Sequence, residues 1–485
     1  MPAFVFDIPW AVLLIIMPLI GMLLAFLFSS VARWVGIVSV LLNLIAVLGL
    51  AWELSGNGVY QHTVGGWSAP LGIELYADGL SLLLLVTTAL VSLGVAVYAA
   101  GYFSHSKAPS FWPIWLMLLT ALNSLFLSSD IFNLYVTLEL LGLSAVALTA
   151  LAGGRAALLG AMRYLLTTLS GSLLYLLGVA LLYHAYDTVD IQLLSQRVSM
   201  SPVTWTALGL MFLGLSIKTA LFPFHFWLPP AHSSAASPVS ALLSALVIKA
   251  SFYIMLRLWL ELFGGFGVID QILGLFGALA VLWGSWQALR QTRLKLLVAY
   301  STVAQIGYLF LAFPLAGGDQ INAWYAAGYL LISHALAKSA MFMATGNLLQ
   351  YGNHDRIADL DRVVQRLPIT AGAFAVAGVS IMGLPPSGGF IGKWWLLESA
   401  LASGRWDLVV VLILGGLLAA AYIFKVLGHT FTEAPVPHAA KRVPPVMQWT
   451  ALILASGSIL LGFLAPLILP LLNIGDAFVA VEVGP

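Results

Sequence analysis

Five lysines of this sequence lie inside otherwise apolar stretches, and they are the residues whose type and position could do chemistry. They are Lys218, Lys249, Lys338, Lys393 and Lys425. A lysine inside a lipid bilayer costs roughly 2.5 to 3.5 kcal/mol even on lenient insertion scales, so each needs a partner, a hydrated cavity or a chemical role. Because a buried amine can lose and regain a proton near neutral pH, the five together predict a proton path across a membrane.

Glu139 is the acid that the pattern places deepest in an apolar run, in DIFNLYVTLELLGL. No basic residue lies within helical reach of it on its own helix, so we expect a partner on another helix. Lys218, in GLSIKTALFPFHFW, is the partner that we predict. Each group would then stabilise the ionised form of the other, and moving one would change the protonation of the other.

His334 and Lys338 are four residues apart in LISHALAKSAMF, which places them on one face of a helix. Imidazole can pass a proton through its two nitrogens. His225 and His232 flank a Trp-Leu-Pro sequence, where proton uptake or capping is the role that we expect. A zinc site needs three or four protein ligands and no others are evident, so we predict no metal and no cofactor.

The remaining candidates differ in their position along the predicted helices. Lys249 lies near the middle of its apolar run, whereas Lys393 comes late in a run directed outward and would suit the outlet of a path. Lys425 could reach its neighbours or form a parallel branch. Arg163 and Arg257 remain charged, so we expect them to anchor helices or to shape the electric field.

Composition requires that these groups be held by membrane helices. The chain has 485 residues, of which 61% are hydrophobic and 8% are charged, with a mean hydropathy of +1.00. Soluble proteins carry about a quarter charged residues, so this is a polytopic membrane protein. A net charge of +1 argues against a nucleic-acid partner. Cysteine is absent, which excludes disulfides and cysteine-bound metal centres in this chain.

Fourteen apolar runs are long enough to cross a hydrocarbon core of about 30 Å, so the predicted fold is all-α with about 14 transmembrane helices. Our approximate spans are 10 to 29, 34 to 52, 79 to 102, 111 to 128, 131 to 152, 157 to 183, 203 to 228, 239 to 263, 268 to 289, 296 to 316, 322 to 350, 369 to 397, 408 to 431 and 446 to 471. The segment from Glu53 to Asp78 is predicted to form a small external hairpin.

Basic residues in the loops test this count, because loops on the inner side of a membrane are rich in Lys and Arg. One set of alternate loops holds only Arg197 and Arg405, and we expect these loops and both termini to face outward. The other set holds Arg33, Lys107, Arg155, Arg290, Arg293, Lys295, Arg356, Arg362, Arg366, Lys441 and Arg442. Acids such as Asp78 and Asp319 are assigned to the outer loops.

Two predicted spans contain helix breakers at membrane depth, namely Leu221 to His232 and Gly383 to Gly392. Such interruptions persist only where the freed backbone groups are buried in protein or line a hydrated cavity. The breakers are Pro223, Pro229, Pro385 and Pro386. Because spans seven and twelve are an odd number of helices apart, we expect two inverted repeats. The predicted divisions are 1–110, 111–263 (helices 4 to 8), 264–431 (helices 9 to 13) and 432–485.

The chain resembles the antiporter-like subunits shared by respiratory complex I, Mrp-type Na⁺/H⁺ antiporters and membrane-bound hydrogenases. The resemblance extends from Glu74 to about Phe431. It rests on Glu139 and on the stretches KTALFPFHFWLPPAH, SPVSALLSALVIK, RLKLLVAYSTVAQIGY, HALAKSAMF and GLPPSGGFIGK. It implies fourteen helices with two inverted five-helix repeats, a coupled Glu139 and Lys218, a central relay at Lys249, a link through His334 and Lys338, and an outlet at Lys393.

The expected function is therefore that of a proton-translocating subunit within a multisubunit membrane complex, with other membrane subunits, protons and Na⁺ as partners. The lysine in span twelve, the short segment after span fourteen and the acid-free PPAHSSAASP favour the D-type subunit of an Mrp antiporter, or a hydrogenase relative, over complex I. The alternatives are a complex I subunit, an autonomous cation transporter and a non-conducting scaffold. The expected location is the plasma membrane of a prokaryote.

Overall fold

The computed structural model describes residues 8–103, 108–264, 266–316, 322–434, 441–476 and 478. Lys107 and Asp319, both assigned to loops by the sequence, lie outside these residues. The helices are α1 (Trp10–Leu27), α2 (Ala32–Asn57), α3 (Gly79–Tyr102), α4 (Ala108–Phe126), α5 (Ile131–Ala150), α6 (Gly154–Tyr186), α7 (Ile191–Ser195), α8 (Pro202–Lys218), α9 (Leu228–Ser234), α10 (Ser237–Leu242), α11 (Ile248–Leu258), α12 (Val268–Arg290), α13 (Leu294–Phe310), α14 (Ala312–Leu315), α15 (Asn322–Gly352), α16 (Val363–Arg366), α17 (Pro368–Met382), α18 (Gly388–Ala402), α19 (Trp406–Phe431) and α20 (Pro445–Leu472).

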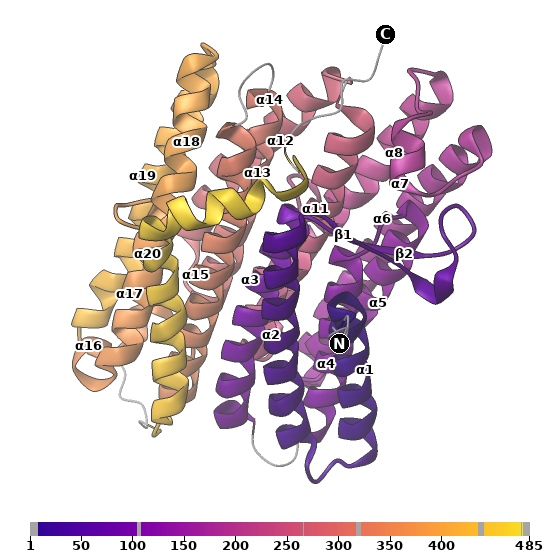
Figure 1. Ribbon diagram of the computed structural model, residues 1–485. Helices are drawn as coiled ribbons and strands as arrows, with labels where there is room; N and C mark the ends of the chain where they lie inside the picture. The colour runs from indigo at the N-terminus through magenta and orange to yellow at the C-terminus, as the bar shows by residue number, and fades with distance from the viewer. Residues whose placement is uncertain are drawn as a thin grey trace.

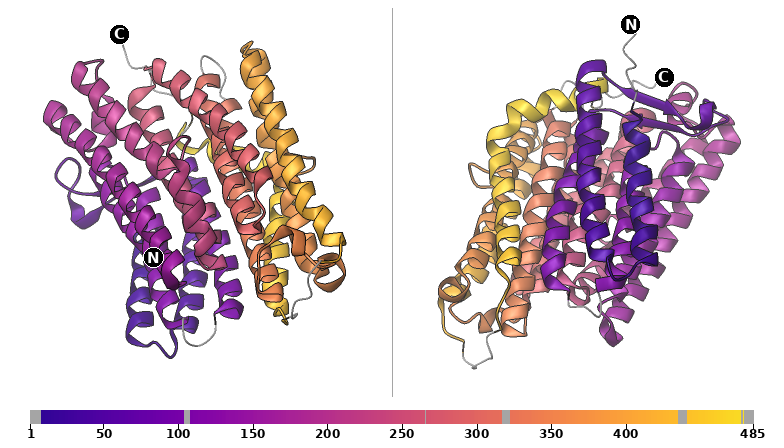
Figure 2. Two further views of the ribbon diagram at one scale, coloured as in Figure 1. Left: turned by 180° about the vertical axis from the view of Figure 1, so that it is seen from behind. Right: turned by 60° about the horizontal axis from the view of Figure 1, so that its bottom comes forward.

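Within the described ranges, ten helices are long and apolar enough to cross a membrane, and α4, α8 and α17 are shorter apolar helices. Each of the fourteen predicted spans coincides with one of these helices, with α15, or with a pair of helices separated by a break. The predicted all-α membrane fold is confirmed. In Figures 1 and 2 the helices lie side by side, with α5 to α8 at one flank, α17 to α19 at the other, and α13 and α15 between them.

The predicted hairpin is present, and its external location stays a prediction. Strand β1 (Tyr60–Thr63) pairs antiparallel with β2 (Glu74–Ala77), and both lie at one end of the bundle, at the top of the right-hand view of Figure 2. We call this end the hairpin end. The described ends of the chain also lie there, because Trp10 packs against Gly49 near the end of α2, and Leu471 packs against Gly79 at the start of α3.

Side-chain caps fix where several helices begin at the hairpin end. Asp78, Asp130 and Asp190 each accept a hydrogen bond from the backbone N–H three residues later, at the starts of α3, α5 and α7. Such caps satisfy backbone donors that have no partner within the helix. Ser201 and Ser387 do the same for α8 and α18.

Both predicted helix breaks are confirmed, with one difference. The first break lies between Lys218 at the end of α8 and a 3₁₀ turn, η2 (Phe224–Trp227), that leads into α9. Pro223 belongs to this break, whereas Pro229 lies in the first turn of α9. Proline is tolerated there because the first N–H groups of a helix have no partner within it.

The second break separates α17 from α18 and contains Pro385 and Pro386. Gly383 ends α17 with φ +81°, a left-handed conformation that glycine adopts without strain. Span seven starts at the hairpin end and span twelve starts at the opposite end, so the two broken spans cross in opposite directions, as inverted repeats require. The exact division of the chain at residues 110, 263 and 431 stays a prediction.

Candidate functional site

Glu139 and Lys218 form the predicted ion pair. Lys218 Nζ lies 2.8 Å from Glu139 Oε1, and the side chains are 6% and 21% exposed, respectively. Lys218 can be reached from α5 because it is the last residue of α8, where the broken span leaves the helix. Ser172 of α6 also donates to Glu139. An α5 carboxylate, an α6 hydroxyl and an α8 ammonium therefore form one polar cluster within the membrane.

A small pocket of about 10 Å³ lies beside this pair. Lys218, Thr168, Tyr164 and Ser251 are among the residues that line it. Thr219, next to Lys218, donates to Ser251 over 2.9 Å. Ser251 lies two residues after Lys249 on α11, so this hydrogen bond ties the end of α8 to the helix that carries the next lysine.

Lys249 lies in the fully buried span Ser237–Phe263. A π-helical segment, η3 (Leu243–Val247), directly precedes α11. Lys249 Nζ donates to the carbonyls of Ser244 at 3.0 Å and Ala245 at 2.7 Å. These carbonyls are exposed to it because the wider π turn disturbs the regular helical hydrogen bonds, a feature frequent at functional sites.

His334 and Lys338 lie on α15 and are buried. Lys338 Nζ donates to Val298 O at 3.0 Å and to the Ser301 hydroxyl, both on α13. Among the residues that the structure describes, neither ring nitrogen of His334 has a hydrogen-bond partner. Lys249, Lys338 and Lys393 all act on His334 electrostatically. An unpartnered buried imidazole among amines is a place where water would complete the hydrogen bonds.

The sequence placed Lys393 after the second break and late in span twelve, with the end of the span predicted at residue 397. Helix α18 continues to Ala402, so Lys393 is the sixth of fifteen residues and lies beside the break. Its Nζ donates to Ile381 O at 2.7 Å and lies 4.3 Å from the centre of the Tyr308 ring. A pocket of about 290 Å³ opens beside Lys393, between α18 and α19. The outlet role of Lys393 stays a prediction.

Residues of α13 that sequence reasoning did not single out lie between Lys338 and Lys393. Ser301 accepts from Lys338, and Gln305, one turn later, donates to Ile381 O at 3.2 Å. Lys393 donates to the same carbonyl. The stretch STVAQIGY contains these polar residues at helical spacing, and that spacing was the signal that could have identified them.

Lys295 was assigned to an inner loop, but it lies on α13, is 3% exposed and donates to Ala235 O. It lines a pocket of about 520 Å³ at the end opposite the hairpin, together with Ser234, Gln350 and Lys441. His232 is buried, stacks on Phe342 with ring centroids 4.9 Å apart, and interacts electrostatically with Lys295 and Lys338.

The other accessory candidates, Lys425, Arg163 and His225, lie apart from the row of side chains between Glu139 and Lys393. Lys425 Nζ donates to Leu289 O and Gln291 O, both at 2.8 Å, where α12 ends. A cation there interacts favourably with the helix dipole. Arg163 is exposed on α6, and His225 is half-buried beside Phe222. In the part of the chain that the structure describes, no group of three or more His, Cys, Asp or Glu could hold a metal ion.

Arg257 forms an ion pair with Asp78, with contacts of 2.5 and 2.8 Å. Its anchoring role stays a prediction. Asp78 lies in the connection between β2 and α3, as the sequence indicated, but its side chain is 1% exposed. A cap at the start of a helix can be covered by neighbouring helices, which hydropathy cannot show.

The helices and the buried charges define a membrane protein of the antiporter-like class. Residues 128–420 match the family described as "NADH:quinone oxidoreductase/Mrp antiporter, TM". This is more than half of the chain, which therefore belongs to that family.

Two relatives and one solved structure show the extent of the similarity. The chain is 36% identical over 439 residues to the N subunit of the NADH-quinone oxidoreductase of Desulforudis audaxviator (strain MP104C), covering 86% of this chain and 87% of that protein. It is 29% identical over 460 residues to the D subunit of the Na(+)/H(+) antiporter of Bacillus subtilis (strain 168), covering 93% and 91%. A chain of the membrane-bound sulfane sulfur reductase, an archaeal respiratory membrane complex, superposes with a TM-score of 0.89 at 26% identity, with 97% of each chain covered. The protein is thus an antiporter-like subunit of the Mrp and complex I type.

Proposed function

We propose that this chain translocates protons along Glu139, Lys218, Lys249, His334, Lys338 and Lys393. The observation that carries the proposal is the ion pair of Glu139 and Lys218 within the membrane, 2.8 Å apart, at one end of a line of buried amines. Structural charges in lipid are rare and are normally paired. Lys249 and Lys338 instead donate only to carbonyls and a hydroxyl, so each can release a proton without leaving a buried carboxylate unpaired.

The pocket at the end opposite the hairpin supports proton uptake there. It would bring water to Lys295, and His232 lies within electrostatic reach of both Lys295 and Lys338. A proton taken up through this pocket would reach the amines at the centre of the axis. The Glu139 edge of the ion pair, 21% exposed, faces the flank where a neighbouring membrane subunit would couple its reaction to the axis.

Lys249 provides a direct test of conduction. Lys249→Met keeps the length of the side chain and removes the titratable amine, so we expect it to reduce coupled proton transport by at least about ten-fold, equivalent to about 1.4 kcal/mol of barrier. The measurement is quenching of a pH-sensitive dye in vesicles that hold the assembled complex. Lys425→Met is the matched control, because Lys425 also donates to two carbonyls but lies off the axis. Equal transport by both variants would overturn the proposal.

The parent complex that we propose is an Mrp-type monovalent cation/proton antiporter in a prokaryotic plasma membrane, with the hairpin end outside. Similarity to the antiporter protein of Bacillus subtilis covers 93% of the chain. A second candidate is a complex of the NADH:quinone oxidoreductase type, and the 36% identity to the Desulforudis audaxviator protein favours it.

Purification of the complex that contains this chain separates these candidates. Na⁺-dependent proton antiport driven by an imposed gradient, without an electron donor, would support the antiporter. Proton transport that requires NADH and a quinone would support the oxidoreductase. Flux through the purified chain alone would favour an autonomous transporter, whereas full transport by an assembled complex with Lys249→Met would favour a scaffold.

A further inference from the structure

The face of α11 that carries Lys249 continues toward the hairpin end. Lys249, Tyr253 and Arg257 follow one another at intervals of four residues, and Glu261 comes four residues later in a π turn, η4 (Trp259–Phe263). Residues four apart lie above one another on a helix. Arg257 therefore lies about 12 Å beyond Lys249, at about 1.5 Å per residue. We call the row from Lys249 to Glu261 the ladder. It could be a proton exit or a closure, and its hydrogen bonds decide between these two roles.

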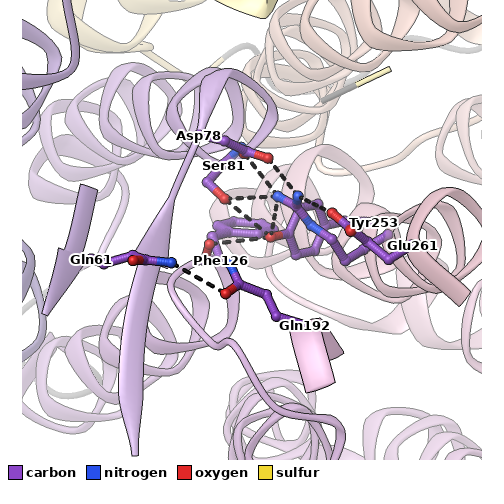
Figure 3. Close-up of polar contacts among 8 residues, drawn as sticks. Gln61, Asp78, Ser81, Phe126, Gln192, Tyr253 and Glu261 are labelled. Atoms are coloured by element: carbon purple, nitrogen blue, oxygen red, sulfur yellow. Dashed lines mark hydrogen bonds and ion pairs between the residues drawn. The ribbon is translucent and has the colours of Figure 1, made fainter. Parts of the chain in front are cut away.

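Arg257 contacts four neighbouring side chains through its two terminal nitrogens. Figure 3 shows these neighbours, Asp78, Ser81, Tyr253 and Glu261, grouped closely together. Both terminal nitrogens bind Asp78, one also contacts Glu261 at 3.4 Å, and the other donates to Ser81 at 3.1 Å and to Tyr253 at 3.2 Å. The guanidinium and the Asp78 carboxylate are 5% and 1% exposed. Glu261, at the outer edge of the group, is 28% exposed.

The remaining members of the group are also satisfied. Ser81 Oγ and Tyr253 Oη lie 3.2 Å apart, and Tyr253 donates to the Phe126 carbonyl at 3.2 Å. Asp78 accepts from the Ser81 backbone N–H at 2.9 Å as well as from Arg257. No buried polar side-chain atom of Asp78, Ser81, Tyr253 or Arg257 lacks a partner. Nothing in this group calls for water.

The polar groups around His334 and Lys393, which form the second half of the proposed proton path, differ from this group in their hydrogen bonding. Both nitrogens of His334 and the hydroxyl of Tyr308 have no hydrogen-bond partner among the described residues, and a pocket opens beside Lys393. Buried polar atoms without a protein partner indicate positions where water binds. The Lys249 ammonium also points away from the ladder, because its hydrogen bonds are to Ser244 and Ala245, on the side away from Tyr253.

We propose that Asp78 and Arg257, with Ser81 and Tyr253, form a dry seal that closes the hairpin end of the first half and forces protons on Lys249 sideways toward the second half. The inference rests on the proposed function. A guanidinium stays protonated, so Arg257 cannot accept and release the transported proton. The seal joins α3, which precedes the first repeat, to the end of α11, so it also fixes the helix that carries Lys249.

The test removes both charges together, so that neither is left buried and unpaired. In the assembled complex, Asp78→Asn with Arg257→Gln should raise the passive proton leak of vesicles about ten-fold under an imposed membrane potential. Arg405→Gln with Asp407→Asn is the matched control, because that ion pair spans 2.9 Å at the hairpin end but is exposed. The control should leave the leak unchanged.

A third substitution shows whether the leak uses the axis. Adding Lys249→Met to the unsealed double variant should return the leak to the control value. A leak that persists without Lys249 would overturn the proposal, as would an unchanged leak in an assembled double variant whose coupled transport still depends on Lys218. If coupled transport does not depend on Lys218 or Lys249 at all, it is the proposed function that fails.

Labelling provides a readout if the double variant assembles poorly. The chain contains no cysteine, so a single Ser81→Cys substitution reports on this site alone. A membrane-impermeant thiol reagent added at the hairpin side should not label the introduced thiol in the otherwise unchanged protein. It should label it when Tyr253→Phe is added, because that change removes three hydrogen bonds of the seal. Rapid labelling of the single substitution in an assembled complex that keeps its proton impermeability would contradict a dry seal.

Discussion

Replacing Lys218 by alanine is the perturbation whose magnitude the structure defines best. Two opposite unit charges 2.8 Å apart attract by about 6 kcal/mol at an effective dielectric constant of about 20. Removing one partner of a buried pair typically costs about 3 to 5 kcal/mol, because the other charge is left without compensation. If proton transfer through the pair limits transport, about 3 kcal/mol corresponds to a decrease of about 100-fold.

The assay is proton uptake by vesicles that contain the purified complex, with assembly verified by co-purification of all subunits. Lys218→Ala and Glu139→Ala should each reduce coupled transport by at least about 100-fold. The double variant should lose little more than either single variant, because the two residues act as one unit.

The control for this cycle is Arg405→Ala. It breaks an ion pair of 2.9 Å on the surface, where such pairs contribute about 0 to 1 kcal/mol, so transport should stay within about two-fold. The reasoning is refuted if an assembled Lys218→Ala complex transports protons at the rate of this control. Additive losses in the double variant would show that the two residues act separately.

Two further predictions concern the outlet and the hairpin end. Lys393→Arg keeps the charge and the hydrogen bond to Ile381, but arginine does not release its proton. We therefore expect stopped-flow dye measurements to show coupled proton transport reduced at least about ten-fold. Near-normal transport would remove Lys393 from the path. At the start of α7, burial raises the pKa of Asp190, and the nearby Glu74 carboxylate adds to this. The folded state therefore favours the neutral form of the Asp190 carboxyl group. The stability that this group contributes to the fold at low pH is lost as the pH rises through its raised pKa. An asparagine at this position caps the helix equally well at any pH. Asp190→Asn should raise the thermal unfolding midpoint at about pH 7.5 and have a smaller effect near pH 4; a lower midpoint at the higher pH would contradict this.

The sequence supplied most of the architecture because lipid restricts which segments can cross a membrane. Apolar length located every span, and the hairpin between the second and third spans was confirmed. The breaks at Pro223 and at Pro385 and Pro386 were visible because proline disrupts a helix in any context. Glu139 and Lys218 were paired correctly, since two isolated opposite charges in an apolar environment strongly favour contact.

The pattern of residues along the sequence could not show which helix ends are covered by neighbouring helices. Asp78 and Lys295 looked like loop residues, but helices from distant parts of the chain bury both. Lys393 was placed close to the end of its span because the predicted span ended at residue 397, whereas α18 continues to Ala402. The sequence had located the break near Lys393, and the structure adds the bond to Ile381. Ser301 and Gln305 are ordinary helical residues until α13 is seen between Lys338 and Lys393.

By itself the sequence determined which groups must be buried, since the cost of a charge in lipid depends on the residue and on its depth in a span. The tertiary structure decided what those groups face. Arg257 meets Asp78 and Lys218 meets Glu139, whereas Lys249 and Lys338 meet only neutral oxygens. These contacts join helices far apart in the chain. They distinguish the Arg257 and Asp78 pair, whose guanidinium stays charged, from Glu139, Lys218, Lys249 and Lys338, which are proposed to carry protons.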